Sequence, residues 1–220
     1  MTETVDPADS DAMVSLGFNA ILAGDLELAE SWFQKAADLG NQGAMRELGV
    51  LAETRGGAGD LELAKSWYQK AVDLGDSEAV FDLGDLAKTA GDFELAESWY
   101  QKALDLGDPG AMLGLGDLAV EAGDLESAKS WYQKLADLGY GARPMLGLGN
   151  LAEEAGDLEL AKSWYQKAAD QIGHPDAMYR LGRLAEEAGD LELAKSWYQK
   201  AAASSAHPYA IDALARLDAS

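Results

Sequence analysis

The sequence predicts an all-α fold, an α-solenoid of about six helix-turn-helix repeats and a C-terminal closing helix. The main observation is a sequence motif, Ser-Trp-Tyr-Gln-Lys, that occurs six times at intervals of 32 to 35 residues, once with Phe in place of Tyr. A period of this length is typical of stacked helical repeats. Two further landmarks, a Gly-Asp pair and a Leu-Gly pair, recur with the same period. We therefore expect one continuous repeat domain over residues 1–220, with no internal linker.

The first helix of each repeat, here called helix A, has the apolar periodicity of an amphipathic helix. In the sixth repeat, apolar residues recur every three or four positions from Met178 to Ala188. Pro175 stands ahead of this stretch, and Pro109 stands at the equivalent place two repeats earlier. Proline suits the first turn of a helix because the N–H that it lacks would be unpaired there. These prolines are expected to mark the start of helix A.

A Gly-Asp pair is expected to separate helix A from the second helix, here called helix B. Glycine adopts the left-handed conformation that ends a helix, and aspartate accepts hydrogen bonds from the first N–H groups of the next one. Helix B then contains the repeated motif. The helix has an acidic residue near its start and a lysine near its end, as the helix dipole favours. The pairs begin at Gly24, Gly59, Gly91, Gly123, Gly156 and Gly189.

Glycine also recurs in the middle of helix A, where it costs about 1 kcal/mol relative to alanine. This cost predicts close approach by a neighbouring helix. Ala215 replaces the glycine in the last helix A, after which no repeat follows, so residues 207–219 are interpreted as a closing helix. The mid-helix glycines are Gly17, Gly49, Gly84, Gly116, Gly149 and Gly182. The predicted repeats cover approximately residues 8–40, 41–75, 76–107, 108–139, 140–173 and 174–206.

Two stretches interrupt the repetition. Residues 55–58, Arg-Gly-Gly-Ala, predict a longer surface loop between the helices of the second repeat. Residues 140–144 replace the usual start of helix A, and Gly114 and Gly147 add a second glycine to two adjacent A helices. Together they predict a weaker, less crowded stretch that could act as a hinge or a binding recess.

These residues resemble the tetratricopeptide and Sel1-like repeat superfamily. Leu181, Gly182, Ala194, Tyr198 and Ala201 match the spacing of a tetratricopeptide unit, and the phrase Trp-Tyr-x-Lys-Ala-Ala is similar to Sel1-like repeats. The usual Sel1 insertion between the helices is absent, and methionine replaces the tetratricopeptide tryptophan, so the chain resembles a short Sel1-like array. The resemblance implies a right-handed superhelix whose concave groove is lined by A helices and recognises proteins, without a catalytic motif.

Composition excludes several classes of function. The chain has 39 acidic and 17 basic residues, a formal net charge of -22, which repels nucleic acid and anionic membranes and favours a basic or amphipathic partner. With no cysteine, disulfides and thiolate metal sites are excluded. Residues 1–7 are polar and acidic, unlike a signal peptide, and no apolar run approaches the ~20 residues of a membrane span, so a cytoplasmic location is expected.

No catalytic residue, metal site or cofactor is expected. The sequence contains no nucleophile elbow, phosphate loop or zinc signature. His174 and His207 each precede a proline and are interpreted as loop or cap residues. The Glu-Glu pairs at 153–154 and 186–187 lack the spacing of a calcium loop and are interpreted as solvated helix faces. The six tryptophans of helix B are interpreted as core and inter-repeat packing rather than as a stacking ladder for a ligand.

The candidate binding residues lie at two positions of helix A that vary between repeats, whereas helix B hardly varies. They form an apolar and aromatic stripe flanked by charges, suited to a peptide or a partner helix. The alternative is neutral drift at solvated positions. The predicted groove residues are Val14, Phe18, Arg46, Val50, Phe81, Asp85, Leu113, Asp117, Leu146, Asn150, Tyr179 and Arg183.

The function that these observations favour is a non-catalytic scaffold that binds a partner protein or peptide in the A-helix groove. Two alternatives stay open. The first is a self-assembling structural module, a homo-oligomer formed through the hydrophobic first helix, which carries Phe18, Ile21 and Leu22. The second is an engineered repeat array, because the solvent-facing residues of helix B repeat more closely than the fold requires.

Overall fold

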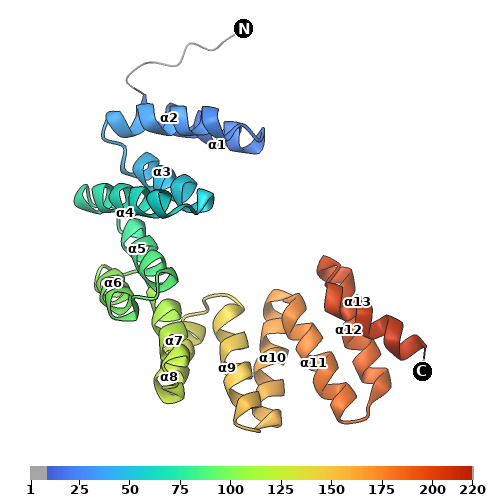
Figure 1. The fold of residues 1–220 in the computed structure, drawn as a ribbon. Helices are drawn as coiled ribbons and strands as arrows, with labels where there is room; N and C mark the ends of the chain where they lie inside the picture. The colour runs from blue at the N-terminus through green and yellow to red at the C-terminus, as the bar shows by residue number, and fades with distance from the viewer. Residues whose placement is uncertain (1–8, 220) are drawn as a thin grey trace. The chain divides into compact units, whose positions relative to one another are not determined.

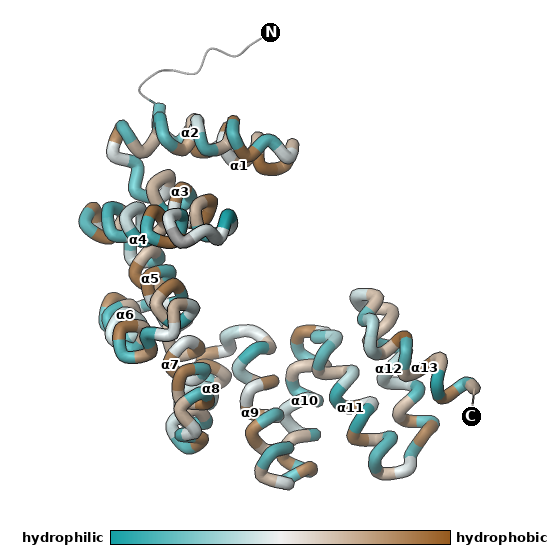
Figure 2. The backbone as a smooth tube through the Cα atoms, in the orientation of Figure 1, coloured by the Kyte–Doolittle hydropathy of each residue, from teal (hydrophilic) through white to brown (hydrophobic). Residues whose placement is uncertain are grey.

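The structure is a computed structural model that describes residues 9–219. This range contains α-helices and no strand, which confirms the all-α prediction (Figure 1). Figure 2 shows apolar and polar residues alternating along the helices, as helices with one buried face require. The helices are α1 (Ser10–Leu22), α2 (Leu26–Asp38), α3 (Gln42–Arg55), α4 (Ala58–Asp73), α5 (Glu78–Thr89), α6 (Phe93–Asp105), α7 (Ala111–Glu121), α8 (Leu125–Asp137), α9 (Arg143–Glu154), α10 (Leu158–Ile172), α11 (Pro175–Glu187), α12 (Leu191–Ser205) and α13 (Pro208–Asp218).

The chain divides into two compact units, residues 1–114 and 115–220. Within unit 1, the A and B helices pair as α1 with α2, α3 with α4 and α5 with α6. Within unit 2, α9 pairs with α10 and α11 with α12, and α13 packs on α12. The helices therefore follow the predicted repeat order. The single domain over residues 1–220 and the cytoplasmic location remain predictions, the latter because residues 1–7 lie outside the described residues.

The turns between A and B helices confirm the predicted cap at five of six places. Asp25, Asp92, Asp124, Asp157 and Asp190 each accept a hydrogen bond from the backbone N–H three residues later, at 3.0 to 3.1 Å. The glycine before each aspartate has a φ of +77° to +81°. The glycine thus allows helix A to end, and the aspartate satisfies an N–H group in the first turn of helix B.

The prediction is wrong at Gly59. Here the left-handed residue is Gly56, with a φ of +72°, and Gly57 is the N-cap of α4. Gly59 and Asp60 consequently lie inside the first turn of α4, and the loop predicted for residues 55–58 consists of Gly56 and Gly57 alone. Gly56 ends helix A before the stop predicted at Gly59, and helix B begins before the start predicted after Asp60, at Ala58.

A second difference concerns Pro109, which precedes α7 instead of opening it. The Asp108 side chain accepts a hydrogen bond from the Gly110 N–H at 2.8 Å, which forms a tight turn, and α7 begins at Ala111. Pro175, in contrast, is the first residue of α11, as predicted.

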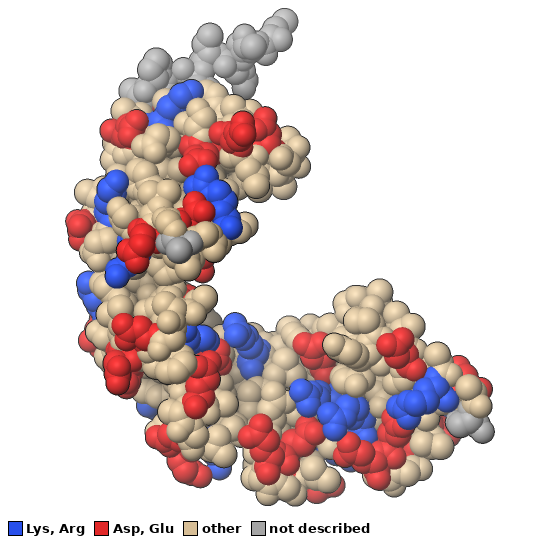
Figure 3. All heavy atoms as spheres, viewed as in Figure 1, with Lys and Arg blue, Asp and Glu red and all other residues tan. Residues whose placement is uncertain are grey.

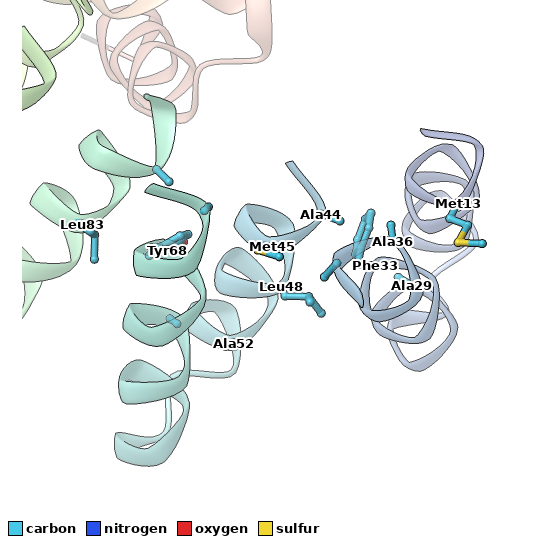
Figure 4. Packing of buried hydrophobic residues seen from close by; sticks show 14 of the residues in the cluster. Met13, Ala29, Phe33, Ala36, Ala44, Met45, Leu48, Ala52, Tyr68 and Leu83 are labelled. Carbon is cyan, nitrogen blue, oxygen red and sulfur yellow. The ribbon is translucent and has the colours of Figure 1, made fainter. Parts of the chain in front are cut away.

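The core of each repeat is an aromatic ring of helix B packed on the mid-helix glycine of helix A. A Cβ atom on these glycines would lie only 2.3 to 2.6 Å from the ring of the same repeat, so the predicted close approach is confirmed. Figure 4 shows one such ring, Phe33, near Ala29 and Ala36 in unit 1, and all three residues are fully buried. The rings are Phe33, Tyr68, Tyr100, Tyr132, Tyr165 and Tyr198.

The additional glycines Gly114 and Gly147 are also crowded, contrary to expectation. A Cβ atom would lie 2.6 Å from the ring of Tyr100 at Gly114 and 2.7 Å from the ring of Tyr132 at Gly147. Each of these tyrosines is therefore enclosed by a glycine of its own helix A and a glycine of the next one. The expectation of open space is therefore wrong at these two glycines, because their missing side chains make room for the rings, while the hinge or recess at residues 140–144 stays a prediction.

The six tryptophans are half-buried, and five of them pack against the core as predicted. Trp32, Trp67 and Trp99 contact the core of unit 1, and Trp164 and Trp197 contact the core of unit 2. A lysine three residues later places its Nζ atom over each of the six rings, 3.8 to 4.8 Å from the centroid. This cation–π contact covers one face of the indole.

Candidate functional site

The predicted groove residues flank the buried ring of each repeat, three residues before and one residue after the mid-helix glycine. None of the twelve is fully buried. Phe18, which is 44% exposed, lies with its ring centroid 5.4 Å from that of Phe33. Phe81 lies 5.4 Å from Tyr100 and Tyr179 lies 5.7 Å from Tyr198. These positions form an outer layer over the ring, which we call the A-helix surface of each unit.

Three of the predicted residues accept a hydrogen bond from a buried tyrosine. The hydroxyl groups of Tyr100, Tyr132 and Tyr165 donate to Asp85 Oδ1, Asp117 Oδ1 and Asn150 Oδ1 at 2.5, 2.7 and 2.7 Å. A buried hydroxyl without an acceptor would cost about 1–3 kcal/mol. Asp85, Asp117 and Asn150 thus have a structural partner in addition to any ligand.

Sequence analysis missed a second set of acceptors, four residues after the mid-helix glycine. Glu53, Glu153 and Glu186 are half-buried and accept from Tyr68, Tyr165 and Tyr198 at 2.9, 2.8 and 2.8 Å. The interpretation of residues 153 and 186 as solvated helix faces is therefore wrong, whereas Glu154 and Glu187 are exposed.

A signal for these acceptors is present in the sequence. In the first repeat the ring is Phe33, which has no hydroxyl, and both acceptor positions are apolar, Phe18 and Ile21. In the other repeats the ring is tyrosine, and a residue at one or both of the two positions accepts a hydrogen bond from its hydroxyl group. Tyrosine and its acceptor vary together between copies.

Burial keeps these tyrosine hydroxyl groups protonated. It raises the pKa of Tyr68, Tyr132, Tyr165 and Tyr198, and the adjacent carboxylate raises the pKa further in each case. A phenol held neutral donates its hydrogen bond at any physiological pH. The rings are therefore fixed in orientation and offer no general base.

In unit 1, the charged part of the A-helix surface centres on Arg46. Its guanidinium contacts Glu78, and it lies 3.5 Å from Glu47 and 3.9 Å from Asp82. Burial raises the pKa of Asp82 to about 7, although Arg46 acts in the opposite direction. Within residues 9–219, Asp82 Oδ2 is one of two buried side-chain polar atoms without a hydrogen-bond partner. Val50, 39% exposed, adds an apolar group to this surface.

In unit 2, arginines reach back to the acidic acceptors of the preceding repeat. Arg183 lies 3.4 Å from Glu153, and Arg216 Nη2 donates to Glu186 at 3.0 Å. The hydrogen bond from Arg216 lowers the pKa of Glu186, and the hydrogen bond to Glu187 raises the pKa of Arg183. Arg143 similarly lies 3.3 Å from Asp117. Tyrosine, acid and arginine thus form a chain of contacts that joins successive repeats.

Two polar cavities open on the A-helix surface of unit 2. One, of about 310 Å³, is bounded by Asn150, Glu153, Glu154 and Arg180. The other has a volume of about 420 Å³, and we call it the C-terminal cleft. Figure 3 shows basic and acidic side chains intermixed over α11 to α13. The C-terminal cleft is lined by Tyr179, Arg183, Glu186, Glu187, Tyr198 and Arg216.

Aromatic side chains continue from the cleft to the start of α13. The His207 ring stacks on Tyr179, with centroids 5.0 Å apart, and Tyr209 lies 6.1 Å from Tyr179. His207 Nδ1 accepts from the Ala210 N–H at 3.3 Å, so Nε2 carries the proton donated to Asp176 at 2.8 Å. His207 is therefore an N-cap, as predicted. His174 is also an N-cap residue, of α11, without a side-chain cap bond.

Across residues 9–219, no group of three or more His, Asp or Glu side chains is arranged to hold a metal ion. In the same range, no helix combines the length and the apolar composition needed to cross a bilayer. Several acidic groups on the A-helix surface contact tyrosine hydroxyls or arginines.

Comparison with known sequences identifies the family. The tetratricopeptide repeat model matches residues 50–111, 81–143 and 113–174, a second such model matches 175–207, and the Sel1 repeat model matches 10–41. The chain belongs to the tetratricopeptide repeat family. No curated protein matches it. Repeat scaffolds of these families generally mediate protein–protein interaction and are typically non-catalytic.

Solved structures show the same fold. Pseudomonas aeruginosa pilF is 19% identical, with a TM-score of 0.72 over 97% of this chain and 99% of that chain. A Sel1 repeat protein from Oxalobacter formigenes is 25% identical, with a TM-score of 0.68 over 92% and 91%. A chain of the APC/C hetero-tetramer Cut9-Hcn1 is 18% identical, with a TM-score of 0.71. The match covers 97% of the present protein but only 43% of the Cut9-Hcn1 chain.

Proposed function

We propose that this protein is a non-catalytic scaffold that binds a partner protein or peptide on its A-helix surface, with the C-terminal cleft as a principal contact. One observation carries the proposal: the cleft combines the partly exposed ring of Tyr179, which lies over the buried ring of Tyr198, with two arginines and two glutamates that are partly or fully exposed. Aromatic residues and arginine are the residue types enriched where interfaces derive their binding energy.

The character of the partner follows from local and overall charge. The cleft itself has equal numbers of arginine and glutamate residues, so it can exchange ion pairs with a partner of either sign. The net charge of -22 for the whole chain favours encounter with a basic or amphipathic partner. We infer that the ring of Tyr179 provides affinity and that the overall charge guides association.

The test compares the partners recovered by tagged versions of the full chain. Tyr179→Ser with Arg183→Ser removes an aromatic and a charged group from the cleft, and Gln199→Ala alters an exposed residue of α12 as a matched control. We expect wild type and the control to recover the same specific proteins and the double variant to lose them at unchanged helicity. Recovery of the same proteins by the double variant would contradict binding at the cleft.

Self-association is a second candidate, supported by the exposed side of α1. Leu22 is 86% exposed, and the other full repeats have threonine or glutamate at its position. Phe18 and Ile21 adjoin it on the same helix. Leu22→Glu, which copies Glu154 and Glu187, should hold the solution mass constant if wild-type mass rises with concentration in light scattering. A constant wild-type mass would exclude this candidate.

A further inference from the structure

Two cavities with matching linings open near the start of helix B, one within each unit. In unit 1, a cavity of about 340 Å³ lies among α4, α5 and α6. In unit 2, a cavity of about 210 Å³ lies among α10, α11 and α12. Each is bounded by helix B of one repeat and both helices of the next. Their residues are distinct from those of the C-terminal cleft, so the inference does not depend on the proposed function.

The floor of each cavity is apolar and consists of buried and partly exposed side chains. In unit 1 it consists of Leu61, Leu83, Leu86, Leu95 and Trp99. Leucine and tryptophan stand at the same register positions in unit 2, where Leu158 is 47% and Leu193 is 39% exposed. Leucine side chains that remain exposed around a recess are the type of surface that another apolar group covers favourably.

The rim of each cavity is acidic with one lysine. Glu62, Asp92 and Lys65 surround the cavity in unit 1, and Glu159, Asp190 and Lys162 surround the one in unit 2. This excess of negative charge attracts a basic group beside the apolar floor. It also disfavours a second copy of the chain, since two molecules of charge -22 repel each other.

The first repeat interface of unit 1 shows a different arrangement at the same place. Arg55 stands at the register position of Ala90 and Ala188, which line the two cavities. Its guanidinium lies 3.0 Å from Glu30 and 3.4 Å from Asp60, and so joins α2, α3 and α4. The protein can therefore place an ion pair across this recess, and at the two cavities it places alanine instead.

We propose that the two cavities are docking sites for a basic amphipathic segment of a partner protein. Such a segment inserts a large apolar side chain between the leucines and the tryptophan and places lysine or arginine beside the acidic rim. The volumes are at or below the lower end of the range of about 300–1,000 Å³ typical of small-molecule sites, which suits a single side-chain anchor. The shared lining lets a repeated motif engage both cavities with one chemistry.

The test uses the full chain labelled with 5-fluorotryptophan and a synthetic helical peptide of leucine and lysine, about 14 residues long so that it can form a helix. The control peptide has serine in place of leucine and the same charge. In ¹⁹F NMR, assigned with single Trp→Phe variants, we expect the Trp99 and Trp197 resonances to shift with the leucine peptide. The Trp67 resonance, beside the Arg55 ion pair, should stay in place, and the serine peptide should cause no shift.

Matched variants close the cavities with the protein's own ion pair. Ala90→Arg with Lys65→Glu copies the Arg55 and Glu30 arrangement in unit 1, and Ala188→Arg with Lys162→Glu copies it in unit 2. For each variant, the peptide concentration that gives half of the shift at its own tryptophan should rise at least about tenfold, which corresponds to 1.4 kcal/mol. The shift at the other tryptophan should be unchanged. An unshifted Trp67 resonance without peptide shows that the fold is retained.

Several results would overturn the proposal. These are equal shifts at Trp67, equal effects of the serine peptide, and closed variants that still bind. Shifts of the Trp99 and Trp197 resonances with protein concentration alone would identify a second copy as the occupant and would also overturn it.

Discussion

The first repeat of unit 1 and the last full repeat of unit 2 fill the same space with different chemistry. In the first, Phe33 packs under Phe18, and the acceptor positions are apolar. In the last, the Tyr198 hydroxyl donates to Glu186, which is also bound by Arg216. The comparison teaches that an A-helix residue is chosen partly by the ring beneath it. Variation along the A-helix surface is therefore not evidence of ligand selection alone.

The largest expected effect is the loss of stability on removing either buried ring, and its size tests whether the two rings contribute equally to packing. Phe33→Ala and Tyr198→Ala should each destabilise the protein by about 3–5 kcal/mol, since both rings are fully buried against a glycine. Urea unfolding followed by circular dichroism measures the change, and Tyr209→Ala, at an exposed ring, serves as the control. A cost below about 1 kcal/mol at Phe33 alone would show that the first repeat is not packed like the last.

Exchanging the two rings tests the polar difference directly. Phe33→Tyr places a hydroxyl beside apolar residues and should cost about 1–3 kcal/mol. Adding Ile21→Glu provides the acceptor found at Glu53, Glu153 and Glu186 and should restore most of that loss. The same unfolding experiment measures both variants. If Phe33→Tyr alone is harmless, water satisfies the hydroxyl and the pairing of tyrosine with an acceptor is not required.

The half-buried carboxylate of Asp82 in unit 1 predicts a pH dependence that the matching position of unit 2, Arg180, lacks. The pKa of Asp82 is raised to about 7, so the folded state binds a proton more tightly than the unfolded chain. The destabilisation caused by ionised Asp82 in the folded state is therefore fully present above pH 7 and disappears as pH falls towards 4. Asp82→Asn should stabilise the protein by on the order of 2 kcal/mol at pH 8.

The thermal midpoints of wild type and Asp82→Asn, measured from pH 4 to pH 8, check this expectation. The difference between them should narrow steadily as pH falls. A constant difference over that range would mean that Asp82 does not titrate there, and a loss of stability at pH 8 would mean that its contact with Arg46 outweighs its burial.

The smallest expected effect concerns the end of α12 in unit 2. Ala206 has a φ of +49°, whereas the equivalent residue after α10 is Gly173, with a φ of +69°. The left-handed conformation costs a non-glycine residue about 1–2 kcal/mol, part of which the larger freedom of glycine in the unfolded chain offsets. Ala206→Gly should raise stability by about 0.5–1 kcal/mol in thermal unfolding. No gain would indicate that the turn relaxes around alanine.

The fold could be predicted from the sequence because its signals are local. The period, the Gly-Asp caps and the mid-helix glycines each act within one turn or one helix pair. Prediction was wrong at Gly59, where a glycine pair three residues earlier provided an alternative stop. It was also wrong at Gly114 and Gly147, because a missing side chain suggests space unless the ring that fills it is known.

The candidate site could be predicted only in part. The two variable positions of helix A do form an outer layer, as their spacing indicates. Glu153 and Glu186, however, looked like ordinary surface acids, because nothing in their own neighbourhood shows that a tyrosine hydroxyl points at them across the repeat. The two leucine-lined cavities arise from three helices of two repeats, so no single segment indicates them.

The origin of each acceptor also bears on how such a chain can grow. A tyrosine and its acceptor lie 12 or 15 residues apart in one repeat, so a duplicated or deleted repeat carries its own complete polar pairing with it. The arginine contacts instead join residues about one period apart, as Arg216 and Glu186 do at 30 residues. Gene duplication can therefore copy a repeat without creating an unpaired buried group, while the arginines determine which copies are well matched as neighbours.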